Sequence, residues 1–409
     1  MERYLNIFLR ALTIGIRFLF LIALAKFVEP SEVGYYGLFV ASIGYAIYFV
    51  GLDFYTYTTR EISVNPSIEQ GRMIKTQAAL SVWLYLIMLP CTIYFLTLTD
   101  LPLLLIWYFA PLLMLEHLNQ EISRLLIAMS RQLTASVVLF LRQGSWALAA
   151  IALMSVSSES RGLLTVMILW SVASAASVLV GCYAVAKLRM NGWRASIDWR
   201  WARRGIAVSF GLLLATIAIR GVQTFDRYWL ESLGGIEIVG AYVLYIGIAS
   251  ALLSFLDAGV FVFTYPALIR HHRLGEYMQA RGVIRNSLIQ TTVIVVGFAV
   301  TTFAALPILL NWIGNDVYKS NFWLYPWILS ATIFNAISFV PHYGLYAFNN
   351  DRQIIFSHIA AFGVFIVLTG ILSFYFKLFS VLIGLNAAFI VIFIWKTIAY
   401  LVIESRRSA

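Results

Sequence analysis

Two apolar segments of this chain carry the same stripe of polar and basic side chains. The stripe comprises Asn6, Arg10, Thr13 and Arg17 in the first segment and Thr216, Arg220, Gln223 and Arg227 in the second. Steps of four, three and four residues place each set on one face of an α-helix, so each segment directs two guanidinium groups the same way. A guanidinium is planar and binds two phosphate oxygens at once. The pattern therefore predicts that at least two of these four arginines contact a phosphate-bearing ligand.

The alternative is that these arginines only hold the helices together. Asp53, Asp257 and the glutamates of other apolar segments are the acids with which they would then pair. An arginine at the centre of a membrane costs about 2.5 to 3.5 kcal/mol on insertion scales, so it must pair, face water or meet a ligand.

A second polar cluster lies in the segment that follows Pro111. It contains Glu116, His117, Asn119, Gln120, Glu121, Ser123 and Arg124. Glu116, Gln120 and Arg124 share one helix face, and His117 and Glu121 share a neighbouring one. One interpretation is a lattice of ion pairs and hydrogen bonds between helices, in which the two acids balance Arg142 and Arg124. The other makes Glu116 or Glu121 a coupling site for H⁺ or Na⁺, a role for which Asp257 is a third candidate.

Metal and nucleotide chemistry find no support in the sequence. His271, His272, His342 and His358 have no Cys, His or carboxylate partner at the spacing of metal ligands. Cys91 and Cys182 lie inside apolar runs and offer no disulfide framework. No Walker-type Gly-Lys-Ser/Thr loop is present. We therefore expect no metal site, no cofactor and no nucleotide hydrolysis by that route.

The elements that must position these groups are transmembrane helices. Hydrophobic residues make up 61% of the 409 residues, charged residues 12%, and the mean hydropathy is +0.85. A water-soluble domain of this composition would expose large apolar patches. Runs of roughly 20 or more apolar residues, the length that crosses a bilayer, number about twelve. They cover residues 5–27, 33–56, 74–98, 101–128, 133–154, 162–186, 205–231, 236–265, 286–311, 321–348, 353–376 and 378–403.

Lys and Arg are concentrated in alternate connections, which predicts that both termini face the cytoplasm. The charged groups inside the spans then gather toward the cytoplasmic side, which suggests a hydrated cavity open to the cytoplasm. The net charge of +10 reflects this orientation and an affinity for anionic lipid headgroups. Nucleic-acid binding is not expected.

The chain divides into two six-helix lobes. Residues 1–186 form the first lobe, residues 187–204 a basic cytoplasmic linker and residues 205–409 the second lobe. Three tryptophans of the linker, Trp193, Trp199 and Trp201, are expected to rest on lipid headgroups, and a dedicated lipid-binding or regulatory role is the alternative. Six helices per lobe give both lobes the same orientation, so the repeat is parallel.

Several short motifs resemble those of a known family. They are the first-helix arginines, Ser31 through Phe39, Gly51-Leu52-Asp53 through Arg60-Glu61, and Asp226-Arg227-Tyr228. Together with the helix number, they make the chain similar to the O-antigen and polysaccharide-repeat flippases (Wzx type). That group belongs to the multidrug/oligosaccharidyl-lipid/polysaccharide exporter superfamily.

The resemblance implies a two-lobed transporter of the bacterial inner membrane rather than an enzyme. It would flip an undecaprenyl-diphosphate-linked oligosaccharide from the inner to the outer leaflet by alternating access. The family's cationic central cavity maps onto Arg10, Arg17, Arg220 and Arg227, and extends to Arg142 and Lys396. Implied partners are the lipid-linked oligosaccharide, anionic membrane lipids and the polysaccharide polymerase machinery.

Three alternatives remain from the sequence. An ion-coupled exporter of drugs or organic cations would line its cavity with carboxylates rather than arginines. A membrane enzyme could be an acyltransferase with an intramembrane histidine such as His342, or a polymerase or ligase of polysaccharide assembly. The polymerases and ligases carry a large outer loop, and every expected outer loop here is short. A structural scaffold would leave the repeated arginine stripe unexplained.

Overall fold

The computed structural model describes residues 2–64 and 69–408, and all regular structure in these ranges is helical. The six long helical spans of the N-terminal part follow the predicted apolar runs closely. They are α1 (Glu2–Phe27), α2 (Pro30–Gly51), α4 (Gln70–Thr97), α5 (Leu103–Ala128), the continuous α6–η1–α7 (Gln132–Val156) and α8 (Leu163–Ala186).

The C-terminal part contains six further long spans. They are α9 (Trp199–Gly234), the continuous α10–η3–α11 (Ile236–Arg273), α12 (Tyr277–Ile313), α14 (Leu324–Ala347), α15 (Asp351–Phe376) and α16 (Leu378–Ser408). Three short elements complete the fold, namely α3 (Tyr55–Val64), η2 (Ser158–Ser160) and α13 (Asp316–Ser320). Among the described residues, eleven helices are long and apolar enough to cross a membrane. The chain is therefore a multi-pass membrane protein.

The twelfth span, α5, has 26 residues and is also long enough to cross a bilayer. Its hydropathy is reduced by the polar cluster from Glu116 to Arg124 in its second half. Glu116, His117 and Asn119 are nevertheless buried, so these polar groups face neighbouring helices rather than lipid. About twelve transmembrane helices, as predicted, are thus present.

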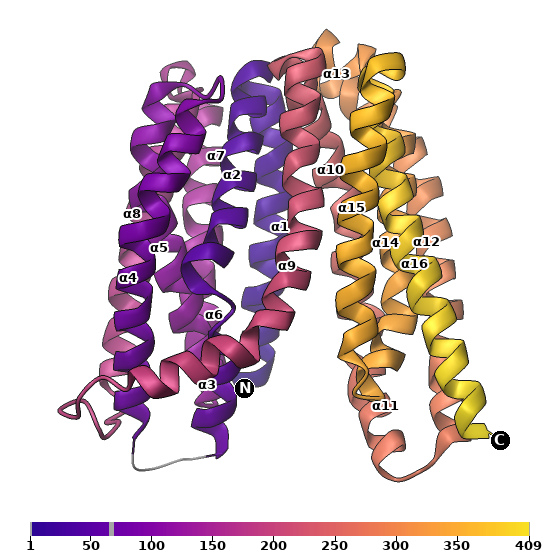
Figure 1. Cartoon of the computed structure of the whole chain (residues 1–409). Helices are drawn as coiled ribbons and strands as arrows, with labels where there is room; N and C mark the ends of the chain where they lie inside the picture. Colours follow the sequence, from indigo (N-terminus) through magenta and orange to yellow (C-terminus); the bar gives the residue numbers. More distant parts are fainter. Residues whose placement is uncertain (1, 65–68, 409) are drawn as a thin grey trace. The chain divides into compact units, whose positions relative to one another are not determined.

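The chain forms two compact units, Met1–Leu213 and Leu214–Ala409. Helices of each unit run alongside one another in Figure 1, and several corresponding pairs of helices meet in both units. The second span packs on the third and fourth, and the sixth on the fourth and fifth, in each unit. The first span packs on the fifth in the N-terminal unit, and its counterpart α9 meets α15 where Gly221 faces Phe362. This repeated set of neighbours supports the parallel duplication inferred from the sequence.

The expected linker differs from the structure in two ways. Residues from Trp199 onward already belong to α9, and the boundary between the units lies inside that helix rather than after Arg204. Trp201 is buried against Phe54 and Tyr57, with ring centroids 5.3 and 5.1 Å apart, so it does not rest on headgroups. The first turns of α9 lie across the ends of the N-terminal helices (Figure 1).

The residues that precede α9 are fixed to α4 by several polar contacts. Lys75 Nζ donates to the carbonyl oxygen of Ala195 at 3.0 Å, and Arg72 Nη2 lies 3.1 Å from Asp198 Oδ2. The pKa of Asp198 is lowered because the backbone N–H of Trp201 donates to its carboxylate, with attraction from Arg72 as a further cause. Asp198 thus stays ionised at neutral pH and caps the beginning of α9.

The run predicted as one span over residues 33–56 is broken at the end of α2. Leu52 and Asp53 both have positive φ, at 50° and 49°, which is rare for residues other than glycine. Gly51 beside them lets His117 approach closely, because a Cβ there would lie 2.8 Å from His117 Nε2 and the ring would have to shift. The break brings Asp53 and α3 next to the polar half of α5.

Candidate functional site

The stripe on α1 is anchored to the fifth span by neutral polar groups. Arg10 Nε donates to Ser136 Oγ at 3.0 Å, and Ser136 in turn donates to Asn6. Arg17 Nη1 donates to Gln143 Oε1 at 3.1 Å. Both arginine side chains are exposed in the structure. Their guanidinium groups are therefore oriented by the lobe, and no carboxylate of the described residues neutralises their charge.

The stripe on α9 is held by groups of the same helix. Arg220 Nη1 donates to the Gln223 side chain at 3.2 Å, and Arg227 Nη1 donates to the Gln223 backbone carbonyl at 2.5 Å. Arg227 Nε is buried and has no hydrogen-bond partner among the described residues. An N–H donor of this kind is costly to leave unsatisfied, so a ligand that accepts from it would be favoured.

Asp226, the acid next to Arg227, is fully buried and serves the packing of α9 on α10. Its Oδ2 accepts a hydrogen bond from the Tyr242 hydroxyl at 2.5 Å, and its Oδ1 accepts from the Arg227 backbone N–H at 2.7 Å. Adjacent residues of a helix point in different directions, so the sequence predicts that Asp226 forms an ion pair with a neighbouring helix rather than with Arg227. In the structure its partner on the neighbouring helix is the uncharged Tyr242. Over residues 2–64 and 69–408, none of Arg10, Arg17 and Arg227 forms an ion pair with a carboxylate.

Arg142 differs from the stripe arginines because it is neutralised inside the N-terminal unit. Arg142 Nε and Nη2 both lie 2.6 Å from Glu116 Oε2. Glu116 Oε1 accepts from Trp170 Nε1 at 2.8 Å and from Ser174 Oγ at 3.0 Å. Both charged residues are buried, with 8% and 4% of their surface exposed. The lattice interpretation applies here, and Arg142 does not present its charge to a ligand.

Local backbone geometry helps to place Arg142 against Glu116. A π-helical turn, Leu141–Ser145, interrupts the fifth span, and its extra residue rotates the side chains that follow. The other π-helical turn, Asp257–Phe261, contains the coupling candidate Asp257. Asp257 is exposed and makes no ion pair in the described part of the chain, so it stays a prediction as a coupling site.

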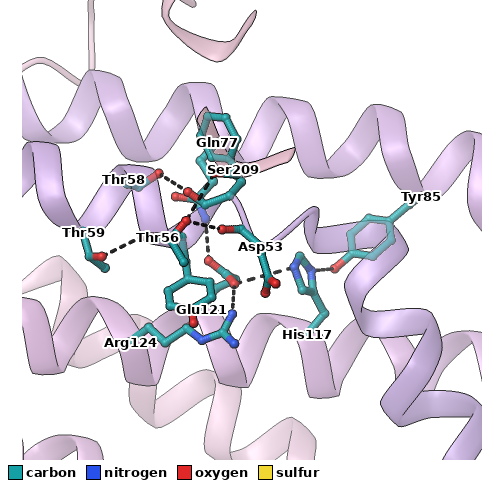
Figure 2. A network of polar contacts seen from close by, with 12 residues as sticks. Asp53, Thr56, Thr58, Thr59, Gln77, Tyr85, His117, Glu121, Arg124 and Ser209 are labelled. Atoms are coloured by element: carbon teal, nitrogen blue, oxygen red, sulfur yellow. Dashed lines mark hydrogen bonds and ion pairs between the residues drawn. The ribbon is translucent and has the colours of Figure 1, made fainter. Parts of the chain in front are cut away.

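Glu121 is the centre of a second network, drawn in Figure 2. Glu121 Oε1 accepts from Arg124 Nη1 at 2.9 Å and lies 3.8 Å from His117 Nε2, and Oε2 accepts from Gln77. His117 Nδ1 shares a hydrogen bond of 2.6 Å with the Tyr85 hydroxyl. The Glu121 side chain keeps 19% of its surface exposed, unlike the buried Glu116. Of the two glutamates, Glu121 is therefore the better placed to exchange a cation with water.

Arg124 is held on both sides in this network. Besides its ion pair with Glu121, its guanidinium carbon lies 3.4 Å from the centroid of the Tyr55 ring, a cation–π contact. The two glutamates thus balance Arg142 and Arg124 in the structure, and it is Glu116 that pairs with Arg142 and Glu121 that pairs with Arg124. The helix spacing of the five polar residues did predict their shared faces, but not which partner each one has.

Lys396, the remaining predicted ligand residue, is buried in the C-terminal unit. Only 3% of its surface is exposed, and its Nζ lies 3.1 Å from His358 Nε2. Its ammonium is therefore inaccessible to a bulky ligand in this conformation. Of the six residues assigned to the cationic cavity, the four stripe arginines thus remain the candidates for ligand contact, and Arg142 and Lys396 do not.

Two arginine-lined grooves were not predicted from the sequence. One of about 480 Å³ is lined by Arg200, Arg203, Arg204 and Ala207 on the first turns of α9. The other, of about 560 Å³, is lined by residues of α11 and the turn after it: Tyr265, Pro266, Ile269, Arg270, Arg273 and Leu274. The spacing of the first set, with steps of three, one and three residues, is the helical signal that could have revealed it.

Replacing Arg200, Arg203 and Arg204 together by glutamine is expected to reduce binding of anionic lipid. Each basic side chain near an anionic membrane surface contributes about 1 kcal/mol, so the triple variant should lose about 3 kcal/mol, or roughly a hundredfold in affinity. The measurement is the ratio of anionic to zwitterionic lipid that co-purifies with the protein. Arg161→Gln is the matched control because Arg161 Nε is already bound to the Met154 carbonyl at 2.9 Å. Unchanged lipid in the triple variant would contradict the role of the groove.

The model of the family described as "Polysaccharide biosynthesis protein" matches residues 5–272 of the chain. No curated protein matches it by sequence. The chain is similar in fold to a multidrug resistance MATE family transporter of the MOP superfamily in an inward-facing conformation. The identity is 13%, the match covers 96% of each chain, and the TM-score is 0.73.

Two further solved structures extend this likeness. A MATE transporter in the bent conformation is 12% identical over 100% of this chain and 97% of its own, with a TM-score of 0.60. A MOP superfamily transporter from Pyrococcus furiosus, whose binding pocket is described as having reverse polarity, is 14% identical over 100% and 95%, with a TM-score of 0.58. At these identities the likeness concerns the fold alone, and that fold is the two-lobed, all-helical one expected from the sequence.

Proposed function

The chain belongs to the polysaccharide biosynthesis protein family and has the fold of MOP superfamily transporters, and from this premise we propose that it flips a lipid-linked oligosaccharide. The substrate is an oligosaccharide joined to undecaprenyl through a diphosphate, such as an O-antigen or other polysaccharide repeat unit. It moves from the inner to the outer leaflet of the bacterial inner membrane, and both termini of the protein face the cytoplasm.

The observation that carries this proposal is the set of arginines inside apolar helices that lack an acidic partner. Arg10, Arg17 and Arg227 lie within membrane spans, and in the described chain none of them forms an ion pair with a carboxylate, although the charge of Arg227 is attracted by the neighbouring Asp226. Such charges are costly in a membrane unless water or an anion meets them. A diphosphate supplies negative charge and several acceptor oxygens, and arginine binds them through two parallel hydrogen bonds.

The sugars of the proposed substrate also require a hydrated path through the protein. Sugar hydroxyls need water or polar side chains along their path, whereas the lipid chain can remain in the bilayer. Coupling candidates are Glu121 and Asp257, whose side chains keep some exposed surface, and the buried Glu116. The membrane potential offers about 2.3 kcal/mol per elementary charge per 100 mV as a further driving force.

An exporter of organic cations is the principal rival, since MATE transporters share the fold. The charge of the stripes disfavours it, because the guanidinium groups of Arg10 and Arg17, which form no ion pair among the described residues, would repel a cationic substrate. A polymerase or ligase of polysaccharide assembly is disfavoured because the expected outer connections between the spans are short. One of the longer of these connections contains only the five-residue helix α13 (Asp316–Ser320) and its flanking turns.

A flipping assay with purified protein in liposomes tests the proposal. The probe is an undecaprenyl-diphosphate-linked disaccharide with a fluorescent label on its sugar, and its leaflet is read from quenching by a membrane-impermeant reductant. We expect the protein to accelerate flipping of this probe over protein-free liposomes, and to leave a labelled undecaprenyl monophosphate much slower. Efflux of ethidium by the same liposomes, without movement of the diphosphate probe, would instead establish the cation exporter.

A further inference from the structure

A buried cation without a carboxylate partner lies inside the C-terminal unit. Lys396, on α16, has 3% of its surface exposed, and its Nζ lies 3.1 Å from Nε2 of His358 on α15. No acidic side chain of residues 2–64 and 69–408 lies within ion-pair distance of either group. Such a site differs from the Glu116–Arg142 pair, in which the buried charges cancel.

A third titratable group faces the same place from α14. The charges of Lys396 and His358 both act on His342, whose Nδ1 is buried and has no hydrogen-bond partner in the described structure. The ring of the adjacent Tyr343 lies edge-on to the His342 ring, at 5.6 Å between centroids, and Asp257 acts electrostatically on Tyr343. From α9, the Ala215 backbone interacts with His358. Helices α9, α14, α15 and α16 thus surround three basic side chains, those of Lys396, His358 and His342.

The hydrogen bond between Lys396 and His358 limits the positive charge that this pair can carry. A protonated lysine offers only donors, and a protonated histidine donates from both nitrogens, so a 3.1 Å contact between two protonated groups would set donor against donor. One of the two nitrogens must accept. The Lys396–His358 pair therefore carries at most one added positive charge, and it becomes neutral when that proton leaves.

The cost of the charged form makes this proton exchangeable. An isolated charge in an apolar interior is costly, and here no acid of the described chain offsets it. Ionisable groups inside membrane spans mark the proton relays of pumps and transporters. Because both nitrogens are buried in this conformation, exchange with water requires a second conformation in which the site opens. A transport cycle with two conformations provides that alternation.

We propose that Lys396, His358 and His342 form a proton-binding site that takes up one proton from water and returns it to water during each transport cycle. Only N–H bonds form and break, so no other reactant is needed. The inference rests on the proposed function in one respect, since it names the proton as the coupling ion. It places the coupling site in the C-terminal unit, on residues other than the candidates Glu116, Glu121 and Asp257.

The first experiment needs no transport substrate. The full-length protein, labelled with ¹⁵N-histidine in lipid nanodiscs, is followed by NMR, and the five histidines are assigned with single His→Gln variants. We expect the His358 ring signals to change between about pH 5 and pH 9, and Lys396→Gln to move that transition by about one pH unit or more. Lys319→Gln, which removes an exposed lysine of α13, should leave it in place. His358 signals that stay constant, or that are the same in Lys396→Gln, would overturn the proposal.

The second experiment measures coupling in the flipping assay with the undecaprenyl-diphosphate disaccharide probe. A gradient of about one pH unit is worth about tenfold in a process that moves one proton. We expect it to change wild-type flipping by several-fold, up to that limit, and Lys396→Gln to lose this response. Wild-type flipping that ignores the gradient would overturn the proton site and leave the proposed function standing. Absence of wild-type flipping would refute the proposed function, and the NMR result would then decide the proton site alone.

Discussion

Replacing Arg17 or Arg227 by alanine is expected to abolish polysaccharide export while the protein still inserts into the membrane. A hydrogen bond between charged groups contributes about 1.5 to 3 kcal/mol, and its loss corresponds to roughly ten- to hundredfold weaker binding of the diphosphate. Arg17 is part of no ion pair in the described chain, so its removal leaves no acid unpaired. Arg227 attracts the neighbouring buried Asp226, which keeps its hydrogen bond from the Tyr242 hydroxyl when the guanidinium is removed. Folding should therefore be preserved.

Complementation of a flippase-null bacterial strain measures this effect, with surface polysaccharide as the readout and membrane immunoblots as the measure of insertion. Lys319→Ala is the matched control because it removes an exposed positive charge outside the stripes. Arg17→Lys separates charge from geometry, since lysine keeps the charge but loses the planar fork, and we expect partial export. Normal export by the quadruple alanine variant of Arg10, Arg17, Arg220 and Arg227 would falsify the ligand role of the stripes.

The spans could be predicted from the sequence because a bilayer imposes a length on apolar runs. All twelve long helical spans overlap an expected run, and the polar α5 was included because Leu, Ile and Phe fill its first half. The break after α2 could not be predicted in the same way. Leu52 and Asp53 both adopt positive φ; aspartate is one of the residue types enriched there, but leucine is not, and the two residues stand inside a run that is otherwise apolar.

The partners of the charged residues could not be predicted from the sequence either, because tertiary contacts determine them. Arg17 and Arg142 both stand in apolar runs, and their local sequences do not differ in any way that assigns a partner. The packing of α5 on the fifth span sets Glu116 against Arg142, whereas the arginines of α1 meet Ser136 and Gln143 on that span. Periodicity gives the face of a helix, and the contact between two helices decides which charge is neutralised.

Arg142→Met is expected to destabilise the protein by about 3 to 5 kcal/mol, because it leaves Glu116 buried and unpaired. Adding Glu116→Gln should restore most of this loss. The glutamine has no charge, and its carbonyl oxygen can still accept from Trp170 Nε1 and Ser174 Oγ, the two donors that bind Glu116 Oε1. The midpoint of thermal aggregation in detergent, followed by size-exclusion chromatography, measures both variants. Arg281→Met is the matched control, since its pair with Glu404 is exposed and worth about 1 kcal/mol at most.

The double variant also separates the two roles considered for Glu116. If Arg142→Met/Glu116→Gln is stable and exports polysaccharide normally, the pair only fixes α5 to the fifth span, and neither residue binds substrate or a coupling ion. A stable double variant without export would show that one of the two charges takes part in transport. A double variant as unstable as Arg142→Met alone would contradict the stability argument itself, because the unpaired carboxylate would then not be the source of the loss.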